Sequence, residues 1–113
     1  MDQDEVRASL SAASADAQRL LVTLGADIAS IVDARRDSST DDEHDPEGAT
    51  LAYERSQADA MRSGALERLV EIQAAQERLE RGAYGTCAVC GVQIPEARLA
   101  LRPWATRCVE HAR

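Results

Sequence analysis

Three cysteines and one histidine near the C-terminal end have the spacing of a metal site. The stretches "CAVC" (residues 87–90) and "CVEH" (residues 108–111) together form the pattern C-x2-C-x17-C-x2-H. Two chelating pairs of this kind present four ligands to one ion, and Zn²⁺ favours thiolate and imidazole ligands in a tetrahedral arrangement. Four protein ligands leave no open position for water, so the predicted zinc is structural. The expected ligands are Cys87, Cys90, Cys108 and His111.

Two other interpretations of these cysteines are weaker. Three unrelated free thiols would not require this spacing, and a thioredoxin-like redox pair would need a βαβ pattern that is missing around residues 87–90. A structural zinc supplies about 10–16 kcal/mol of apparent binding energy, enough to fold a short segment with little core of its own. Between the two pairs, we expect four apolar residues to pack against the base of the helices: Ile94, Leu99, Leu101 and Trp104.

A second group of chemically active side chains lies in "DDEHDPEGAT", residues 41–50. Five carboxylates occur here without a lysine or arginine to offset them. Asp45 and Pro46 have a structural explanation, because Asp is a good N-cap and Pro suits the first position of a helix. Asp41, Asp42, Glu43 and Glu47 have no such role. The stretch is either a solvated turn or an element that presents negative charge.

Two amphipathic helices flank this acidic stretch. Apolar residues recur at steps of three and four before it and near heptad spacing after it, which predicts one apolar stripe on each helix. The first helix is expected to end near Arg35 and Arg36, and the second near Gly82. The first stripe consists of Val6, Leu10, Ala13, Ala17, Leu20, Leu24, Ile28 and Ile31. The second consists of Leu51, Ala58, Met61, Ala65, Leu69, Ile72 and Leu79.

The expected fold is mainly α: a long antiparallel coiled-coil helical hairpin with a small C-terminal zinc-ribbon-like finger. Residues 1–36 form helix one, 37–48 an acidic tip loop, 49–82 helix two and 83–113 the zinc-finger segment. Each helix would be about 50 Å long at 1.5 Å per residue, so the acidic loop would lie far from the cysteines. In the alternative arrangement, each stripe pairs with another copy of the protein.

Composition narrows the classes of function. The chain has 113 residues and a formal net charge of −7, and all 13 basic residues are arginine. Direct DNA binding is not expected, because it depends on basic residues that neutralise phosphates. The acidic N-terminus and the lack of a long apolar run predict a cytoplasmic protein without membrane spans. The sequence shows no nucleophile–base pair and no phosphate-binding loop, so an enzyme is not expected.

The finger residues resemble a known family. The stretch "RGAYGTCAVCGVQIPEARLALRPWATRCVEHAR" is similar to the C-terminal zinc finger of the DksA/TraR family of bacterial transcription regulators. That family combines G-x-[FY]-G-x-C-x-x-C-G with [ER]-A-R-L-x-[AL]-x-P-x-A and a final C-x-x-C. The residues in register are Gly82, Tyr84, Gly85, Cys87, Cys90, Gly91, Ala97, Arg98, Leu99, Pro103, Ala105 and Cys108.

This resemblance implies a function. Members of the family bind RNA polymerase directly and not DNA, and their coiled coil enters the secondary channel, where acids at the tip act near the catalytic magnesium. The resemblance thus implies a monomeric regulator that modulates initiation. Its polymerase-contacting tip would comprise Asp41, Asp42, Glu43, Asp45, Glu47 and Ala49. The alternative is a coiled-coil scaffold that self-assembles and carries a structural zinc cap.

The chain departs from the family pattern in three places. His111 stands where the family has a fourth cysteine, which changes the predicted site to Cys3His. The tip signature D-x-x-D-x-A is not reproduced, because counting back from Cys87 places His44, Glu47 and Ala49 at its three fixed positions. The stretch "VEIQAAQ" of helix two lacks the cations that an alarmone such as ppGpp would need, so the sequence does not support a ppGpp-dependent response.

Overall fold

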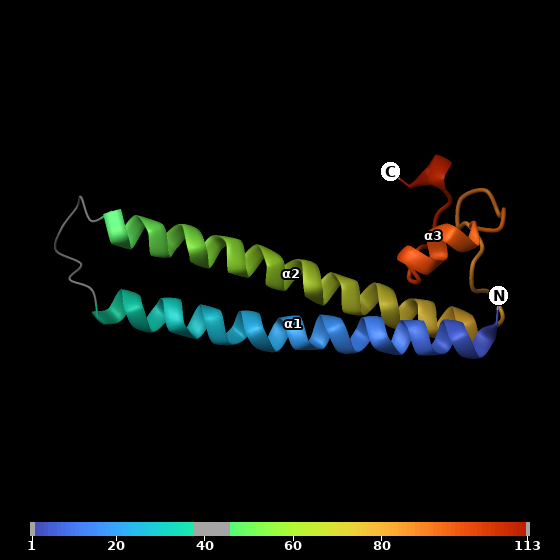
Figure 1. Ribbon diagram of the computed structural model, residues 1–113. Coiled ribbons are helices and arrows are strands. Elements are labelled where there is room, and N and C mark those ends of the chain that lie inside the picture. The colour runs from blue at the N-terminus through green and yellow to red at the C-terminus, as the bar shows by residue number, and fades with distance from the viewer. Residues whose placement is uncertain (1, 38–45, 113) are drawn as a thin grey trace. The chain divides into compact units, whose positions relative to one another are not determined.

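Helices dominate the computed structural model, which describes residues 2–37 and 46–112. The elements are α1 (Gln3–Asp37), α2 (Pro46–Glu80), α3 (Glu96–Leu101) and a single 3-10 turn, η1 (Val109–His111) (Figure 1). Over the described ranges there is no β-strand, only an isolated antiparallel bridge between Thr86 and Gln93. The predicted mainly helical fold, a two-helix hairpin followed by a cysteine-bearing segment, is confirmed. None of the described helices is both long and apolar enough to cross a membrane.

The helix ends follow from local chemistry. Asp2 caps α1, since its side-chain Oδ1 accepts a hydrogen bond from the backbone N–H of Asp4 at 3.0 Å. Helix α2 begins at Pro46, so residues 46–48, which we had assigned to the loop, are helical. Proline can occupy the first helical position because the N–H that it lacks would have no partner there.

Gly82 ends α2 with a Schellman motif. The N–H of Ala83 donates to the carbonyl of Arg78 at 2.8 Å, and the N–H of Gly82 donates to the carbonyl of Leu79 at 3.2 Å. Gly82 has a φ of 75°, a left-handed conformation that glycine adopts without steric cost. The predicted terminator is therefore the one that the chain uses.

The described chain divides into two compact units. The first comprises Met1–Asp16 and Arg68–Arg113. In it the start of α1 lies antiparallel to the end of α2, and Arg7 forms an ion pair with Glu80 at 3.0 Å. We call its helical core the helix cluster, which consists of Val6, Leu10, Ile72, Ala75 and Leu79.

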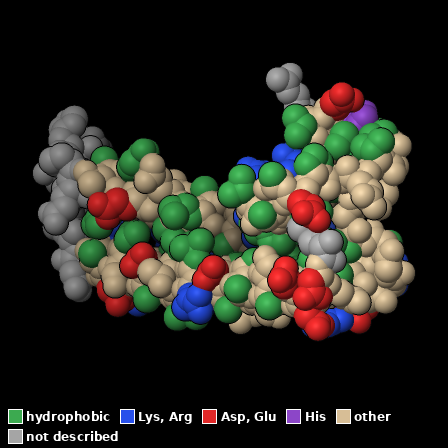
Figure 2. All heavy atoms as spheres, turned by 45° about the vertical axis from the view of Figure 1, so that its right-hand side comes forward, with side chains coloured by type: hydrophobic (Ala, Val, Ile, Leu, Met, Phe, Trp, Pro, Cys, Tyr) green, Lys and Arg blue, Asp and Glu red, His purple; other side chains and the backbone are tan. Residues whose placement is uncertain are grey.

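The second unit, Ala17–Glu67, contains the rest of both helices. Most of its buried residues are alanines, so fewer large side chains are buried here than in the helix cluster. Two members of the predicted stripes are more exposed than expected, Leu20 at 39% and Met61 at 54%. On the face shown in Figure 2, acidic side chains lie among exposed apolar ones along the helices.

The apolar residues of the finger differ from expectation. Ile94 and Leu99 are buried, but within the finger itself, beside Cys87 and Cys108. Leu101 is 82% exposed, so the prediction that it packs on the helices is wrong. It is the last residue of the six-residue helix α3, whose one buried residue is Leu99, and a helix this short covers its core with a single face. Trp104 packs against the helix cluster as predicted.

The helix cluster should carry much of the stability of the first unit. Leu10 is 0% exposed, and we expect Leu10→Ala to lower the free energy of unfolding by about 2–5 kcal/mol through lost burial and a cavity. Leu20→Ala, the same change at a partly exposed position of α1, should cost much less. Urea denaturation of zinc-loaded protein, followed by circular dichroism, measures both. Equal losses in the two variants would contradict this account of the core.

Candidate metal centre

The first cysteine pair lies on a tight backbone hairpin. The N–H of Cys87 donates to the carbonyl of Val92 at 2.8 Å, and the N–H of Gly91 donates back to the carbonyl of Cys87 at 3.0 Å. Gly91 has a φ of 75°, which allows the chain to reverse directly after Cys90. The hairpin continues with the N–H of Ile94 donating to the carbonyl of Gly85 at 2.7 Å. These backbone hydrogen bonds thus hold both thiols on the same side of the hairpin.

The second pair lies at the turn η1. The N–H of His111 donates to the carbonyl of Cys108 at 3.0 Å, which brings the two side chains onto the same side of the turn. A further backbone bond joins the two loops, from the N–H of Ala88 to the carbonyl of Thr106 at 2.8 Å. The two side chains of the C-x2-H motif therefore converge, and a backbone hydrogen bond joins the two loops.

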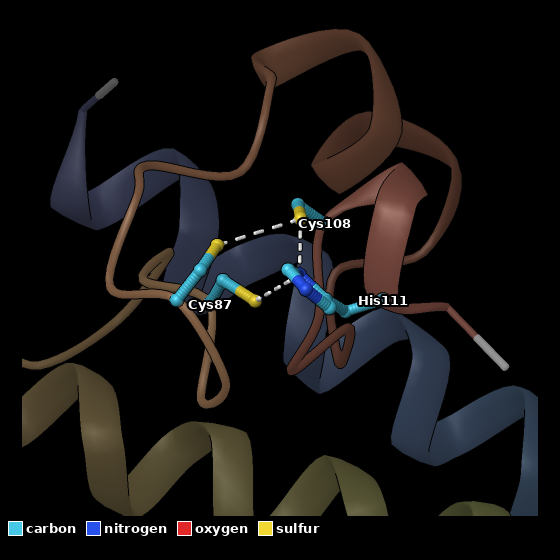
Figure 3. A group of neighbouring side chains, drawn as sticks. Cys87, Cys108 and His111 are labelled. Carbon is cyan, nitrogen blue, oxygen red and sulfur yellow. Dashed lines mark hydrogen bonds between the residues drawn. The ribbon is translucent and has the colours of Figure 1, made fainter.

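The four predicted ligands converge. One ligand atom from each of Cys87, Cys90, Cys108 and His111 lies within 4.8 Å of the others. Figure 3 shows the labelled side chains of Cys87, Cys108 and His111 pointing toward one another. The Sγ atoms of Cys90 and Cys108 are 3.7 Å apart, and Nδ1 of His111 lies 3.8 Å from Sγ of Cys87 and 3.2 Å from Sγ of Cys108.

These distances suit a tetrahedral zinc. With Zn–S of about 2.3 Å and Zn–N of about 2.0–2.1 Å, the edges of a regular tetrahedron are about 3.8 Å between two sulfurs and about 3.6 Å between sulfur and nitrogen. The Cys90–Cys108 sulfur distance of 3.7 Å and the Cys87–His111 distance of 3.8 Å are close to these values, whereas the Cys108–His111 distance of 3.2 Å is shorter. Nδ1, the nitrogen that faces the sulfurs, is the atom that would bind the metal.

The electrostatics of the cluster also favour a cation. Backbone N–H groups of Cys108, Cys90 and Val89 lower the pKa of the Cys87 thiol to about 5, against the effect of burial. The pKa of Cys90 is raised: the Val92 N–H lowers it, but burial and the neighbouring sulfurs of Cys87 and Cys108 outweigh that bond. Several thiolates at this distance repel one another, and Zn²⁺ removes the repulsion.

The cluster is built into the core of the finger. Cys87, 2% exposed, and Cys108 are buried together with Ile94, Leu99 and Ala105. Cys90 is exposed and His111 is half-buried, so one side of the centre faces solvent. A site with four protein donors and this packing holds a structural zinc, which binds the loops together without performing chemistry.

A basic cavity that the sequence did not indicate lies in the same unit. The fold gathers three arginines of residues 82–113 with Arg78 of α2 around a cavity of ≈ 490 Å³. Arg98, Arg102 and Arg107 are close in the sequence, but Arg78 precedes the first of them by 20 positions, so only the tertiary fold reveals the cluster. Its charged lining residues are Arg78, Arg98, Arg102, Arg107 and Glu71. The positive balance favours an anionic group.

The structure brings together the predicted metal ligands, whereas it describes only part of the predicted tip. Asp41, Asp42, Glu43 and Asp45 lie outside the described residues. Glu47 lies in the first turn of α2, and Ala49 is exposed on the same helix. The role of all six tip residues stays a prediction.

Comparison with known proteins agrees with the finger geometry. Residues 82–110 match the family model "Prokaryotic dksA/traR C4-type zinc finger". Two curated relatives are each 37% identical: an uncharacterised protein of Aquifex aeolicus (strain VF5) over 62 residues, and the uncharacterised protein YteA of Bacillus subtilis (strain 168) over 71 residues. The matches cover 55% and 63% of this chain, but only 43% and 30% of those relatives.

A solved structure extends the likeness from the finger to nearly the whole chain. Transcription factor DksA2 from Pseudomonas aeruginosa is 30% identical and superposes with a TM-score of 0.67 over 97% of this chain and 81% of DksA2. The chain belongs to the DksA/TraR family. As a DksA/TraR protein it departs from the C4-type finger at its fourth donor, His111, which lies one residue beyond the matched stretch. The cluster accommodates this change because imidazole is also a zinc ligand.

Proposed function

We propose that this DksA/TraR protein is a transcription regulator that binds RNA polymerase directly through its secondary channel and modulates initiation. The observation that carries the proposal is the likeness of nearly the whole chain to the transcription factor DksA2. In this proposal the protein is a cytoplasmic monomer without enzymatic activity, and it does not bind DNA directly. One Zn²⁺, held by Cys87, Cys90, Cys108 and His111, keeps the finger folded.

The charge distribution supports a basic partner. Residues 17–67 contain 11 acids and 5 arginines, so the second unit accounts for −6 of the net charge of −7. An acidic segment between two helices complements a positively lined channel or a magnesium centre. We infer that the acids of residues 41–47 act at the polymerase, with Asp41, Asp42, Glu43, Asp45, Glu47 and Ala49 as its contacts.

Co-sedimentation with core RNA polymerase tests the proposal. We expect the zinc-loaded protein to sediment with the enzyme and to be displaced by an unrelated factor that occupies the secondary channel. Displacement is the informative step, because it identifies the surface of the polymerase. Binding that the competitor leaves unchanged would contradict insertion into the channel. A stable dimer indifferent to polymerase would instead favour the coiled-coil scaffold.

The basic cavity is a reason to include ppGpp in the transcription assay. Its arginines provide positive charge that the stretch "VEIQAAQ" of helix two lacks, and phosphate is an anion that arginine binds well. The structure thereby gives more support to a ppGpp response than the sequence does. Transcription should therefore be measured with and without ppGpp.

A further inference from the structure

Trp104, the only tryptophan of the chain, lies at the junction between the finger and the helices of the first unit. Its side chain packs against the helix cluster. The next residue, Ala105, is buried in the finger core beside Cys87 and Cys108. Two consecutive residues thus enter two different cores, so neither can shift far without disturbing the other.

Two arginines of α2 hold Trp104 in place. The guanidinium carbon of Arg68 lies 4.0 Å from the centroid of the indole ring, a cation–π contact. Nη2 of Arg78 donates a hydrogen bond to the carbonyl of Trp104 at 3.5 Å. The ring and the backbone of this residue are therefore both bound to the same helix.

Arg68 has few other interactions that could replace the ring. Its Nε is buried and forms no hydrogen bond within the part of the chain that the structure describes. Glu71 is an ion-pair partner of this nitrogen, with Oε2 at 3.7 Å, which is beyond hydrogen-bond distance. Cation–π contacts strengthen when the cation is withdrawn from water. The indole face therefore stabilises the partly buried charge of Arg68 together with the long ion pair to Glu71.

The same segment also touches the metal centre. The carbonyl of Thr106, two residues after Trp104, accepts the hydrogen bond from the N–H of Ala88, which lies between Cys87 and Cys90. Nε of Arg98 donates to the carbonyl of Arg107 at 3.0 Å, which fixes the same strip to α3. A rearrangement of the first cysteine loop would therefore move residues 104–106.

We propose that Arg68 and Trp104 form a latch that couples zinc occupancy to the docking of the finger on α2. With zinc bound, the cysteine loops hold residues 104–106 in the position that places the indole under Arg68. Loss of zinc frees those residues and releases Trp104 from the arginine. Because such coupling is reciprocal, weakening the latch must lower the affinity for zinc by the same factor. We expect this loss of affinity to appear as faster release of zinc.

The test compares full-length, zinc-loaded Arg68→Met with the unaltered protein. Methionine keeps an apolar stem over the ring and removes the cation. Arg62→Met, at an exposed position of the same helix, is the matched control. Zinc transfer to an excess of a chromogenic chelator gives the release rate. We expect release several-fold faster from Arg68→Met and unchanged from the control. Identical rates in all three proteins would overturn the proposal.

A double-mutant cycle separates the latch from a general loss of stability. Trp104→Leu keeps an apolar group at the junction, and its zinc release is measured with the same chelator. If the two residues act as a pair, Arg68→Met should add little to the release rate once Trp104 is leucine. Fully additive effects would refute the pairing. Polymerase binding is not a readout, so the result is independent of the proposed function.

Tryptophan fluorescence gives a second measurement. In the unaltered protein, removal of zinc should shift the Trp104 emission to longer wavelength as the ring becomes exposed. In Arg68→Met the zinc-loaded spectrum should already lie part of the way toward the unloaded one. A spectrum that does not respond to zinc in either protein would contradict the coupling.

Discussion

Replacing Cys87 by serine is expected to abolish stoichiometric zinc binding and to unfold the finger. Cys87 is buried at the centre of the finger core, and its sulfur lies 3.8 Å from Nδ1 of His111. Structural zinc sites supply about 10–16 kcal/mol, which far exceeds what a core of five small and medium side chains can replace. Cys108→Ser should have the same effect, because Cys108 lies in the same buried cluster.

Metal content and tertiary structure are measured together. Elemental analysis of the purified variants should give no zinc, where the unaltered protein gives one equivalent. The Trp104 emission should move to longer wavelength, while far-ultraviolet circular dichroism retains most of its helical signal, since α1 and α2 supply most helical residues. Val89→Ser, an exposed change inside the same loop, is the control and should keep its zinc. Full zinc in both cysteine variants would rule out the proposed ligands.

The role of His111 can be tested without destroying the site. His111→Cys converts the centre to the C4 type that the family model describes, and we expect it to retain one zinc. His111→Ala leaves three donors and should lower the affinity for zinc by at least about tenfold, since even the loss of a group that only supports a ligand costs about 10–100-fold. Competition with a chelator of known affinity measures both variants. Equal affinity of the alanine variant and the unaltered protein would remove His111 from the ligand set.

Neutralising Asp42, Asp45 and Glu47 together is expected to remove the effect on transcription while leaving polymerase binding largely intact. In our proposal these acids act at the catalytic centre of the polymerase, whereas the rest of the protein's surface provides the affinity for the polymerase. Asparagine is as good an N-cap residue as aspartate, so the change at position 45 removes charge and keeps the cap that the sequence predicts there. Single-round transcription and polymerase co-sedimentation measure the two effects separately.

A matched variant controls for the change in net charge. Asp33→Asn, Glu54→Gln and Glu67→Gln remove the same three charges from exposed positions elsewhere on the two helices. This protein should retain its effect on transcription. If both triple variants lose activity equally, the total charge matters and the acidic segment has no special role. If the tip variant loses binding and activity in parallel, the segment is an affinity element.

The helical fold could be predicted from the sequence because its signals are local. The apolar stripe of α1, Pro46 at the start of α2 and Gly82 after its end each depend on nearby residues only. The wrong predictions concern residues whose burial depends on how the two helices pack. Leu20 and Met61 fit the periodicity but are substantially exposed, because two paired helices bury a narrow seam. Ala75 was missed, although it is fully buried, since alanine is not a distinctive apolar signal.

The metal site was predictable for a similar reason. Its ligands lie in two short motifs, and each motif converges through backbone bonds over three or four residues. The basic cavity and the Arg68–Trp104 contact join residues that are 20 to 36 positions apart. No local pattern indicates which arginine of α2 meets the finger. The basic cavity and the Arg68–Trp104 contact could therefore be recognised only in the three-dimensional structure.

Site-specific photo-crosslinking from position 49 is the most direct test of insertion into the secondary channel. Ala49 is exposed on α2, so a photoreactive amino acid can replace it without disturbing a core. With core RNA polymerase, the account predicts a crosslink to the segments around the catalytic magnesium, lost when a competing secondary-channel factor is added. Crosslinks confined to the outer surface of the polymerase, or unaffected by the competitor, would contradict it.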